Sequence, residues 1–344
     1  MKRTTIRDVA NAAGVGIVTV SRALNDQEGV SEETRQRIKA VAQQLDYQPN
    51  RHARYLKLTN NRSVAIMVKG MDNPLFGGML EVIGREVREK QYSMKVVALQ
   101  HWADELQEAM HTIDEDYVAG VIFLGARFRQ RESRLPRLKV PYVVSTVSNY
   151  ANDDATYCSV SVSDRDEARQ VVERLLARGH RRIGILGSDM TDFSVGRLRL
   201  EGYLEAMHEA GIRVPREWIR SFAPDDDSPY SYAHGYRMTQ DLLRVAPDVT
   251  AIFGIADVLA IGAMRAAREA GLQVPSDISI AGFDGIEVSR HVQPALATLA
   301  QPTEQIAKLT CQMLFSQIDG EKPRQILVPG HWVEGGTIAQ PRGE

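Results

Sequence analysis

The chain has 344 residues, more than one ordinary core accommodates, so its length predicts two or three domains. Hydrophobic residues make up 43% of it and charged residues 25%, which is typical of globular proteins and excludes disordered, fibrous and membrane classes. The N-terminus has no apolar signal core, and no stretch approaches the roughly 18 apolar residues of a membrane span. We therefore expect a cytoplasmic protein without a membrane partner.

Charge is unevenly distributed along the chain, although the net charge is only −2. Residues 1–60 contain ten Lys and Arg against six Asp and Glu, so this segment carries +4 and the remainder −6. A basic head on an acidic body indicates that the head contacts a polyanion such as nucleic acid. The two cysteines, Cys158 and Cys311, belong to no CxxC or Cys/His cluster, so we expect no disulfide, metal or cofactor.

The first sixty residues show the pattern of a helix-turn-helix domain. Thr5 followed by Asp8 matches the S/T-x-x-D/E start of a helix, and Gly14 predicts its end. After a short turn, residues 17–24 predict a second helix, and Ser31 predicts the cap of a third. Two short helices joined by a three-residue glycine turn are typical of DNA-binding proteins of this kind.

The segments TIRDVANAAGVGIVTVSRALN and VSEETRQRIKAVAQQLDYQPNRHARYL resemble the lactose/galactose repressor family. In that family the second helix enters the major groove, so the resemblance implies base-facing roles for Ile17, Val18 and Arg22. The guanidinium of Arg22 suits a guanine edge, whereas the two apolar side chains suit thymine methyl groups. The resemblance also implies phosphate contacts from Thr5, Thr19, Ser21, Asn25 and Thr34.

Residues 49–62 are predicted to form a hinge between the head and the body. Asn50 follows a proline and can cap a helix of about two turns, which is too short to be stable alone. In the family, the equivalent segments of two subunits pair in the minor groove and insert a leucine between base steps. The resemblance therefore implies that Leu56 is the inserted side chain and that Asn50 and Ala53 lie beside it.

From Ser63 the pattern changes to alternating strands and helices. The apolar runs SVAIMV, MKVVAL, GVIFLG and VPYVVS predict one set of strands, and RIGILG, TAIFGI and SIAGF predict a second set. We therefore expect a small all-α head followed by an α/β sensor of two doubly wound parallel sheets, similar to periplasmic binding proteins. The predicted domains are a DNA-binding domain of residues 1–48, a hinge of 49–62 and an effector-binding and dimerisation domain of 63–344, with an N-lobe of 63–160 and 292–324 and a C-lobe of 161–291 and 325–344.

The ends of the predicted strands carry the candidate effector site, because ligands of open parallel sheets bind beyond the carboxyl ends of the strands. The segments NPLF, RLEGY, ADVLAIGAM and AGFDGI resemble the sensor domain of the same family, so the resemblance covers essentially the whole chain. Thr146 differs from the aspartate of several family members. Carboxylates, a guanidinium and aromatic faces suit a sugar or sugar derivative. The implied effector contacts are Asn73, Leu75, Phe76, Thr146, Arg199, Tyr230, Asp257 and Asp284.

The predicted function is that of a transcriptional repressor of a carbohydrate-utilisation operon. It would bind a pseudo-palindromic double-stranded operator as a homodimer and respond to the effector in the interlobe cleft. A purine or nucleoside effector and a protein corepressor are alternatives, and the sign of the effector's action and a tetramer stay open. A transport receptor would share the body, but the basic head and the lack of a signal peptide count against it. We find no nucleophile elbow, phosphate loop or HExxH motif, so we do not expect an enzyme.

Overall fold

The computed structural model describes residues 6–24, 29–45, 62–126, 138–147, 157–187, 195–222 and 229–342. The chain divides into two compact units, Met1–Asn61 and Arg62–Glu344. Several predicted DNA contacts lie outside the described residues: Thr5, Asn25, Asn50, Ala53 and Leu56, together with the side chains of Val18 and Ser21.

The first unit contains three helices, α1 (Ile6–Ala13), α2 (Ile17–Leu24) and α3 (Glu32–Gln44). Gly14 follows α1 with a φ of 65°, the left-handed conformation expected of a residue that ends a helix. Ser31 caps α3, because its hydroxyl accepts a hydrogen bond from the Thr34 amide at 3.3 Å. One face of each helix enters a shared core, which confirms the predicted helix-turn-helix. The core residues are Val9, Ala10, Ala13, Val20, Ala23, Ile38 and Ala42.

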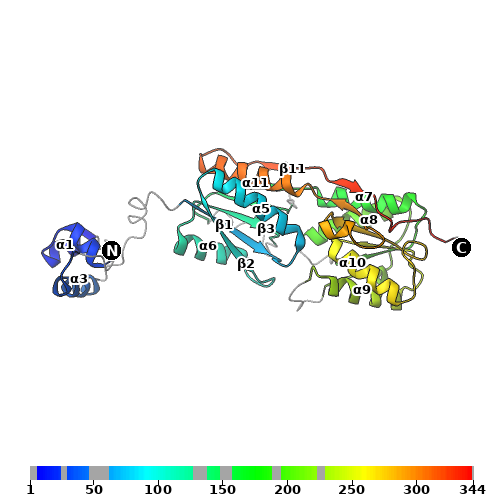
Figure 1. Ribbon diagram of the computed structural model, residues 1–344, viewed down its shortest axis with the longest axis horizontal. Helices are drawn as coiled ribbons and strands as arrows, with labels where there is room; N and C mark the ends of the chain where they lie inside the picture. The colour runs from blue at the N-terminus through cyan, green and yellow to red at the C-terminus, as the bar shows by residue number, and fades with distance from the viewer. Residues whose placement is uncertain are drawn as a thin grey trace. The chain divides into compact units, whose positions relative to one another are not determined.

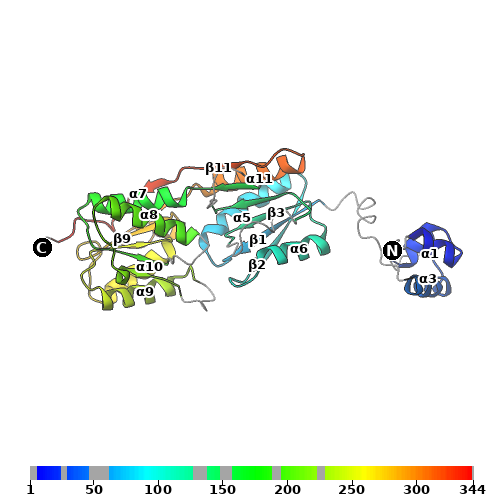
Figure 2. The same ribbon diagram turned by 180° about the vertical axis from the view of Figure 1, so that it is seen from behind.

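The described part of the second unit contains two six-stranded sheets, one in each lobe (Figures 1 and 2). The first sheet has the strand order β11–β5–β4–β3–β1–β2, and every neighbouring pair is parallel. We call the lobe around this sheet the N-lobe. Its strands are β1 (Ser63–Lys69), β2 (Ser93–Leu99), β3 (Gly120–Leu124), β4 (Tyr142–Ser145), β5 (Cys158–Ser161) and β11 (Gln325–Leu327).

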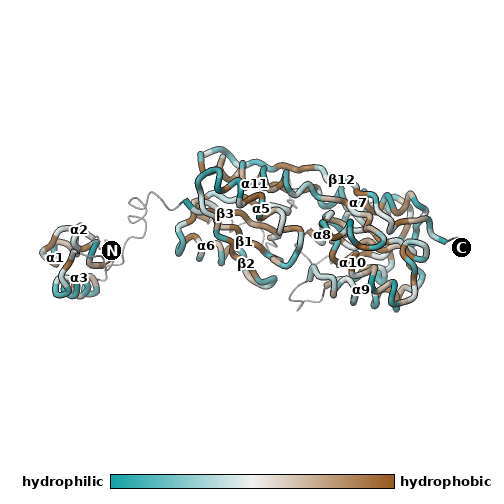
Figure 3. Tube along the Cα trace, viewed as in Figure 1, coloured by the Kyte–Doolittle hydropathy of each residue, from teal (hydrophilic) through white to brown (hydrophobic). Residues whose placement is uncertain are grey.

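Both faces of the first sheet are covered by helices. Ile66 and Val68 of β1 pack in one apolar cluster with helices α5 and α11, whereas Ala65 and Met67 pack in another with α6. Because alternate side chains of a strand point to opposite faces, a strand that is covered on both faces is apolar between its ends, as β1 is from Val64 to Val68. Figure 3 shows these strands as hydrophobic segments inside the lobe. The helices are α5 (Pro74–Glu89), α6 (Glu105–Asp116) and α11 (Thr303–Ile318).

The second sheet, in the C-lobe, has the order β7–β6–β8–β9–β10–β12 and is parallel except for β12, which runs antiparallel to β10. Helices α7 and α8 lie on one face of it and α9 and α10 on the other (Figure 1). This arrangement confirms the predicted fold class. The bounds are β6 (Ile183–Leu186), β7 (Ile219–Arg220), β8 (Ala251–Gly254), β9 (Ser279–Asp284), β10 (Ala297–Ala300) and β12 (His331–Val333), with α7 (Asp164–Ala177), α8 (Val195–Glu209), α9 (Tyr232–Val245) and α10 (Asp257–Glu269), and with single 3₁₀ turns at Arg216–Trp218 and Glu287–Arg290.

The chain crosses between the lobes at two places that differ from those predicted. Residues 292–324 were expected in the N-lobe, but β10 pairs with β9 in the second sheet. Residues 325–344 were expected in the C-lobe, but β11 pairs with β5 in the first sheet. The chain therefore crosses after β10 and again after β11. Strands of three or four residues are too short for their apolar pattern to indicate which sheet they join, because that choice depends on long-range pairing.

Candidate functional site

A cavity lies between the two lobes, at the carboxyl ends of β1, β3, β4 and β9. It encloses about 550 Å³ of empty space, including its open mouth, which is in the size range of small-molecule sites. Seven of the eight predicted effector contacts line this interlobe cleft, and only Asp257 does not. The lining residues are Lys69, Gly70, Asn73, Leu75, Phe76, His101, Gly125, Ala126, Thr146, Val147, Val195, Arg199, Tyr230, Asp284 and Gln301.

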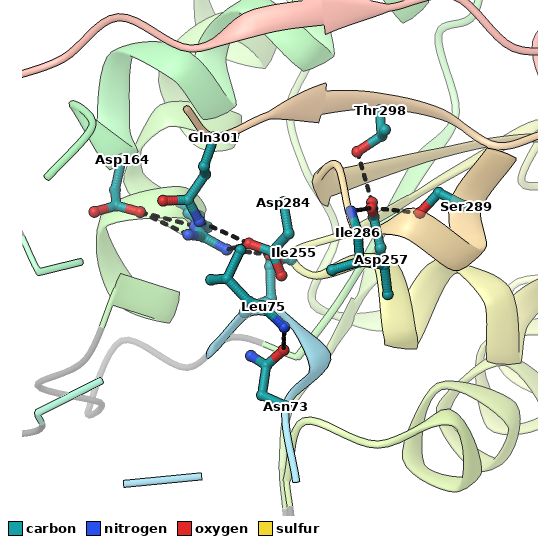
Figure 4. A network of polar contacts seen from close by, with 11 residues as sticks. Asn73, Leu75, Asp164, Ile255, Asp257, Asp284, Ile286, Ser289, Thr298 and Gln301 are labelled. Atoms are coloured by element: carbon teal, nitrogen blue, oxygen red, sulfur yellow. Dashed lines mark hydrogen bonds and ion pairs between the residues drawn. The ribbon is translucent and has the colours of Figure 1, made fainter. Parts of the chain in front are cut away.

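Asn73 fixes the N-lobe wall by capping helix α5. Its Oδ1 accepts a hydrogen bond from the Leu75 amide at 3.0 Å, and Pro74 occupies the first turn, where no amide is needed (Figure 4). The helix therefore begins at the cleft, and its first turn brings the buried side chains of Leu75 and Phe76 to the cavity.

Gly125 makes room for the Phe76 ring. It follows β3 with a φ of 67°, and a Cβ atom there would lie 2.7 Å from both the Lys69 carbonyl oxygen and Cζ of Phe76. Thr146, at the end of β4, has the same φ of 67° although it is not glycine. Its hydroxyl donates to the Ser145 carbonyl at 2.6 Å and accepts from the Gly125 amide at 3.2 Å. Thr146 thus joins the ends of β3 and β4 through its side chain.

Arg199 dominates the C-lobe wall. It projects from α8 and is 3% exposed. Its Nε and Nη2 donate to Asp164 Oδ1 at 2.9 and 2.8 Å, and its Nη1 donates to the Ile255 carbonyl oxygen. The same Nη1 lies 3.4 Å from Asp284 Oδ1, and the guanidinium stacks 3.7 Å from the centre of the Phe283 ring. These contacts hold the guanidinium in one orientation, because a planar group with so many partners cannot rotate.

Asp284 ends β9 beside this guanidinium, with an unusual φ of 120°. Its Oδ1 also accepts a hydrogen bond from Gln301 Nε2 at 2.8 Å. Burial raises the pKa of Asp284 to about 7, against the opposing effect of Arg199 and with a contribution from the neighbouring Asp257. The side chain is therefore a hydrogen-bonding group whose charge changes near neutral pH.

The structure places Asp257 behind the cleft wall instead of in the cavity. It is fully buried at the start of α10, and burial raises its pKa to about 6. Its Oδ2 accepts from the Ile286 amide at 2.9 Å and from Ser289 Oγ at 2.6 Å, and its Oδ1 accepts from Thr298 Oγ1 at 2.6 Å (Figure 4). Asp257 thus joins β10 to the segment that follows Asp284, and it positions the C-lobe wall.

Three polar lining residues, Lys69, His101 and Gln301, were missed by sequence reasoning. Lys69 is 3% exposed, forms an ion pair with the buried Glu105 and donates to the Ala103 carbonyl at 2.9 Å. A lysine that ends an otherwise apolar strand is a signal that sequence reasoning can use. His101 follows β2, and Gln301 lies where the chain crosses between the lobes. Neither carries a comparable sequence signal.

The first unit presents part of the predicted DNA-reading surface on α2. Ile17 is 41% exposed, which is unusual for a large apolar side chain, and Arg22 is exposed on the same helix. Thr19 is half-buried, and the hydroxyl of Thr34 lies 2.8 Å from Ser31 Oγ at the start of α3. An exposed guanidinium and an exposed apolar group on one short helix suit contact with base edges.

Within the described residues, no helix is both long and apolar enough to cross a bilayer, and no three His, Cys, Asp or Glu side chains gather as a metal site.

Residues 5–50 match the family described as bacterial regulatory proteins, lacI family, and residues 172–338 match the periplasmic binding protein-like domain.

Comparison with known proteins extends this match to the whole chain. The transcriptional regulator MalR of Clostridium butyricum is 34% identical over 330 residues, which span 94% of this chain and 96% of that protein. The transcriptional repressor PurR of Escherichia coli is 30% identical over 339 residues, 97% of each chain. Among solved structures, the regulator CelR in complex with cellobiose has a TM-score of 0.70 at 27% identity and covers 97% of this chain and 100% of its own.

The Lac repressor dimer, bound to operator and the anti-inducer ONPF, also has a TM-score of 0.70 at 27% identity, and the match covers 98% of this chain and 100% of that one. A relative of at least 30% identity over nearly the full length, together with the domain match at the head, establishes the family that the sequence resembled. The chain belongs to the LacI family of bacterial DNA-binding transcriptional regulators, which are not enzymes.

Proposed function

We propose that this protein represses a carbohydrate-utilisation operon, binds a pseudo-palindromic operator as a homodimer and is switched by a sugar or sugar derivative in the interlobe cleft. The observation that carries the proposal of an effector is that both lobes supply side chains to one cavity: strand ends of both sheets supply polar groups, and the neighbouring helices and loops supply aromatic ones. The similarity to CelR, solved with cellobiose, and to the Lac repressor dimer, solved on its operator, supports the proposal.

The charges of the cleft favour a neutral polar ligand. Arg199 is paired with Asp164 and Asp284, and Lys69 is paired with Glu105. Because each buried cation already has a carboxylate, an ionic ligand would bring an uncompensated charge into the site. A sugar brings hydroxyl groups that donate to a carboxylate, and an apolar ring face that covers an aromatic side chain.

A thermal-shift screen against sugars, sugar phosphates, polyols and nucleobases tests the effector class. A ligand at a hundred times its Kd adds about 2.7 kcal/mol of stability. We expect the strongest stabilisation from a neutral sugar. A nucleobase hit would favour the purine alternative, and no hit across the panel would favour a protein corepressor. Adding the hit to an operator titration gives the sign of its action, because the two affinities are linked reciprocally.

Operator binding is tested with two arginine variants of the head, since Arg22 is exposed on α2 and Arg37 on α3. Arg22→Gln should lose roughly 1–3 kcal/mol of specific binding while non-specific binding changes little, because a guanine contact is lost. Arg37→Gln should keep the discrimination between operator and random DNA. Equal loss of discrimination in both variants would argue against α2 as the reading helix. Sedimentation of the free protein tests the dimer.

A further inference from the structure

In the described part of the second unit, the chain crosses between the lobes three times, and each crossing is short. The first crossing lies between β5 and α7, the second between β10 and α11, and the third between β11 and β12. A hinge between two packed lobes lies in such connections, because each lobe moves as a unit. The contacts that hold each crossing to its lobe therefore decide how the lobes can move.

The third crossing is anchored to both lobes within three residues. The Val328 amide donates to the Ser161 carbonyl of β5 at 2.8 Å, which ties the start of the crossing to the N-lobe. The Gly330 amide donates to Glu167 Oε1 of α7 at 2.8 Å, which ties its end to the C-lobe. The residue between these amides is Pro329, whose ring fixes φ at about −65°. The third crossing therefore bends only around Pro329.

Glu167 holds this crossing at a cost in solvation energy. It is 6% exposed, and within the described residues no basic side chain forms an ion pair with it. Burial raises the pKa of Glu167, the Gly330 amide opposes this effect, and Asp166 and Asp164 add to it. A buried carboxylate without a cation is unfavourable, and a neutral side chain would fill the same space at less cost. What the carboxylate adds is a strong acceptor for the Gly330 amide.

Helix α7 holds the end of the third crossing at a second point. The Arg174 guanidinium lies over the Trp332 ring of β12, 4.9 Å from its centre. Glu167 and Arg174 are seven residues apart and so lie on one face of α7. A Cβ atom at Gly330 would lie 3.3 Å from Glu167 Oε2, so the backbone and the carboxylate are closely packed. The segment from Gly330 to Trp332 thus follows α7.

The first turn of α7 also carries part of the effector wall. Asp164 begins the helix directly after the first crossing and accepts hydrogen bonds from Arg199 at 2.9 and 2.8 Å. Asp284, the second carboxylate beside Arg199, accepts from Gln301 Nε2 at 2.8 Å, and its carbonyl accepts from the Gln301 amide at 3.0 Å (Figure 4). Groups around Arg199 therefore hold the first two crossings, and Glu167, one turn after Asp164, holds the third.

We propose that Glu167 is a positioning residue of the interlobe hinge. Its carboxylate holds the third crossing to α7, so that bending there is confined to Pro329 and the crossing moves together with the helix that binds Arg199. Without this contact the bend extends beyond Pro329, and the lobes sample a wider range of separations. The proposal does not depend on which ligand the interlobe cleft binds.

Amide hydrogen exchange of the full-length protein tests the contact itself. Glu167→Ala should speed the exchange of the Gly330 amide at least about tenfold, because a hydrogen bond to a charged group is lost. Glu167→Gln keeps an acceptor oxygen and should cause a smaller increase. Glu173→Ala is the control on the same helix, because the Glu173 side chain is 44% exposed. This control should leave the exchange of the Gly330 amide unchanged.

Pulsed electron spin resonance tests the hinge. Spin labels on Glu108→Cys of α6 and Ala233→Cys of α9, both exposed, report the distance between the lobes, and the native cysteines are buried. Dilution with unlabelled protein restricts the signal to distances within one chain. Glu167→Ala should broaden the distance distribution and release the Gly330 amide. Pro329→Gly should broaden the distribution while the Gly330 amide stays protected, because only the bend becomes freer.

Three results would overturn the proposal. An unchanged exchange of the Gly330 amide in Glu167→Ala would mean that the carboxylate does not hold the crossing. Faster exchange with a distance distribution of wild-type width would mean that the contact belongs only to the fold of the C-lobe. A wild-type width in Pro329→Gly would place the bend elsewhere. Urea unfolding checks that each variant is folded, and Pro329 is exposed, so its replacement tests the hinge even if Glu167→Ala does not fold.

Discussion

The two walls of the interlobe cleft are built by different kinds of interaction. The C-lobe wall is a set of buried ionisable groups, since Arg199 contacts both Asp164 and Asp284 and all three are 1–3% exposed. The N-lobe wall contains a buried ion pair, Lys69 with Glu105, and otherwise rests on packing and backbone hydrogen bonds, with Phe76 against Gly125 and Asn73 capping α5. The C-lobe wall thus depends mainly on charge and the N-lobe wall mainly on shape.

This difference has consequences for substitution. A buried ion that loses its partner leaves an uncompensated charge, which costs several kcal/mol, whereas a packed wall loses only the contacts of the atoms removed. The charged wall can orient hydroxyl groups because its own geometry is fixed, and the packed wall limits the size and face of the ligand. We therefore expect the largest losses of stability on the C-lobe side and smaller ones on the N-lobe side.

Arg199→Met tests the charged wall most severely. The variant leaves Asp164 and Asp284 without their cation, and we expect it to lower the free energy of unfolding by about 3–5 kcal/mol. Arg197→Met on the same helix is the matched control, because the side chains of Arg197 and its partner Glu201 are 34% and 26% exposed, so this pair is far more accessible to solvent than the Arg199 network. This control should lose less than about 1 kcal/mol in urea unfolding. Equal losses of unfolding free energy in the two variants would show that the buried network around Arg199 adds nothing to stability.

Asp284→Asn tests the charge state of the same wall. The pKa of Asp284 in the folded protein, about 7, lies above the ordinary value of 3.8, so the folded state binds the proton more tightly than the unfolded state. The resulting stability is complete below about pH 4 and is lost as the pH rises through about 7. The free energy of unfolding of the wild type minus that of the asparagine variant should fall by roughly 2 kcal/mol between pH 5 and pH 7. Urea unfolding across this pH range measures the difference. A difference that grows with pH would refute the raised pKa of Asp284.

Gly125→Ala tests the packed wall. The new Cβ would adopt a left-handed φ and meet the Lys69 carbonyl and the Phe76 ring at 2.7 Å, so we expect a loss of about 1–2 kcal/mol from the backbone alone. Gly78→Ala is the control, because Gly78 lies inside α5, just beyond its first turn, and a Cβ atom there would meet nothing within 4 Å. Removing that helical glycine should add roughly 0.5–1 kcal/mol. A Gly125→Ala variant as stable as the wild type would mean that the wall adjusts freely.

The sequence predicted much of the cleft because parallel strands bring their carboxyl ends to one edge. Apolar runs located β1, β3, β4 and β9, and the polar residues after them could be proposed from that position alone. Arg199 and Tyr230 lie on no strand end, so their proposal depended on the family resemblance. Structure and sequence therefore agree best where a local pattern determines the position of a side chain.

The remaining features depend on contacts between distant parts of the chain. Asp257 follows a strand just as Asp284 does, yet it is bound by Ile286, Ser289 and Thr298, which come 29 to 41 residues later. No local pattern distinguishes a carboxylate buried by such partners from one that faces a ligand. Gln301 was missed because it lies on a crossing between the lobes, and strands too short to show a pattern precede and follow that region.

Asn73→Ala tests the smallest contribution to the packed wall, the cap of α5. Removing Oδ1 leaves the Leu75 amide without its acceptor, and we expect a loss of about 1 kcal/mol in the free energy of unfolding. Asn73→Asp should restore the stability, because a carboxylate accepts the same hydrogen bond and favours the positive end of the helix. Ser163→Ala is the control, since Ser163 precedes α7 but caps no backbone amide, and its hydroxyl instead donates to the Asp166 side chain in an exposed hydrogen bond of 2.6 Å. If alanine at both positions costs the same, the cap does not hold the wall, and Leu75 and Phe76 are positioned by packing alone.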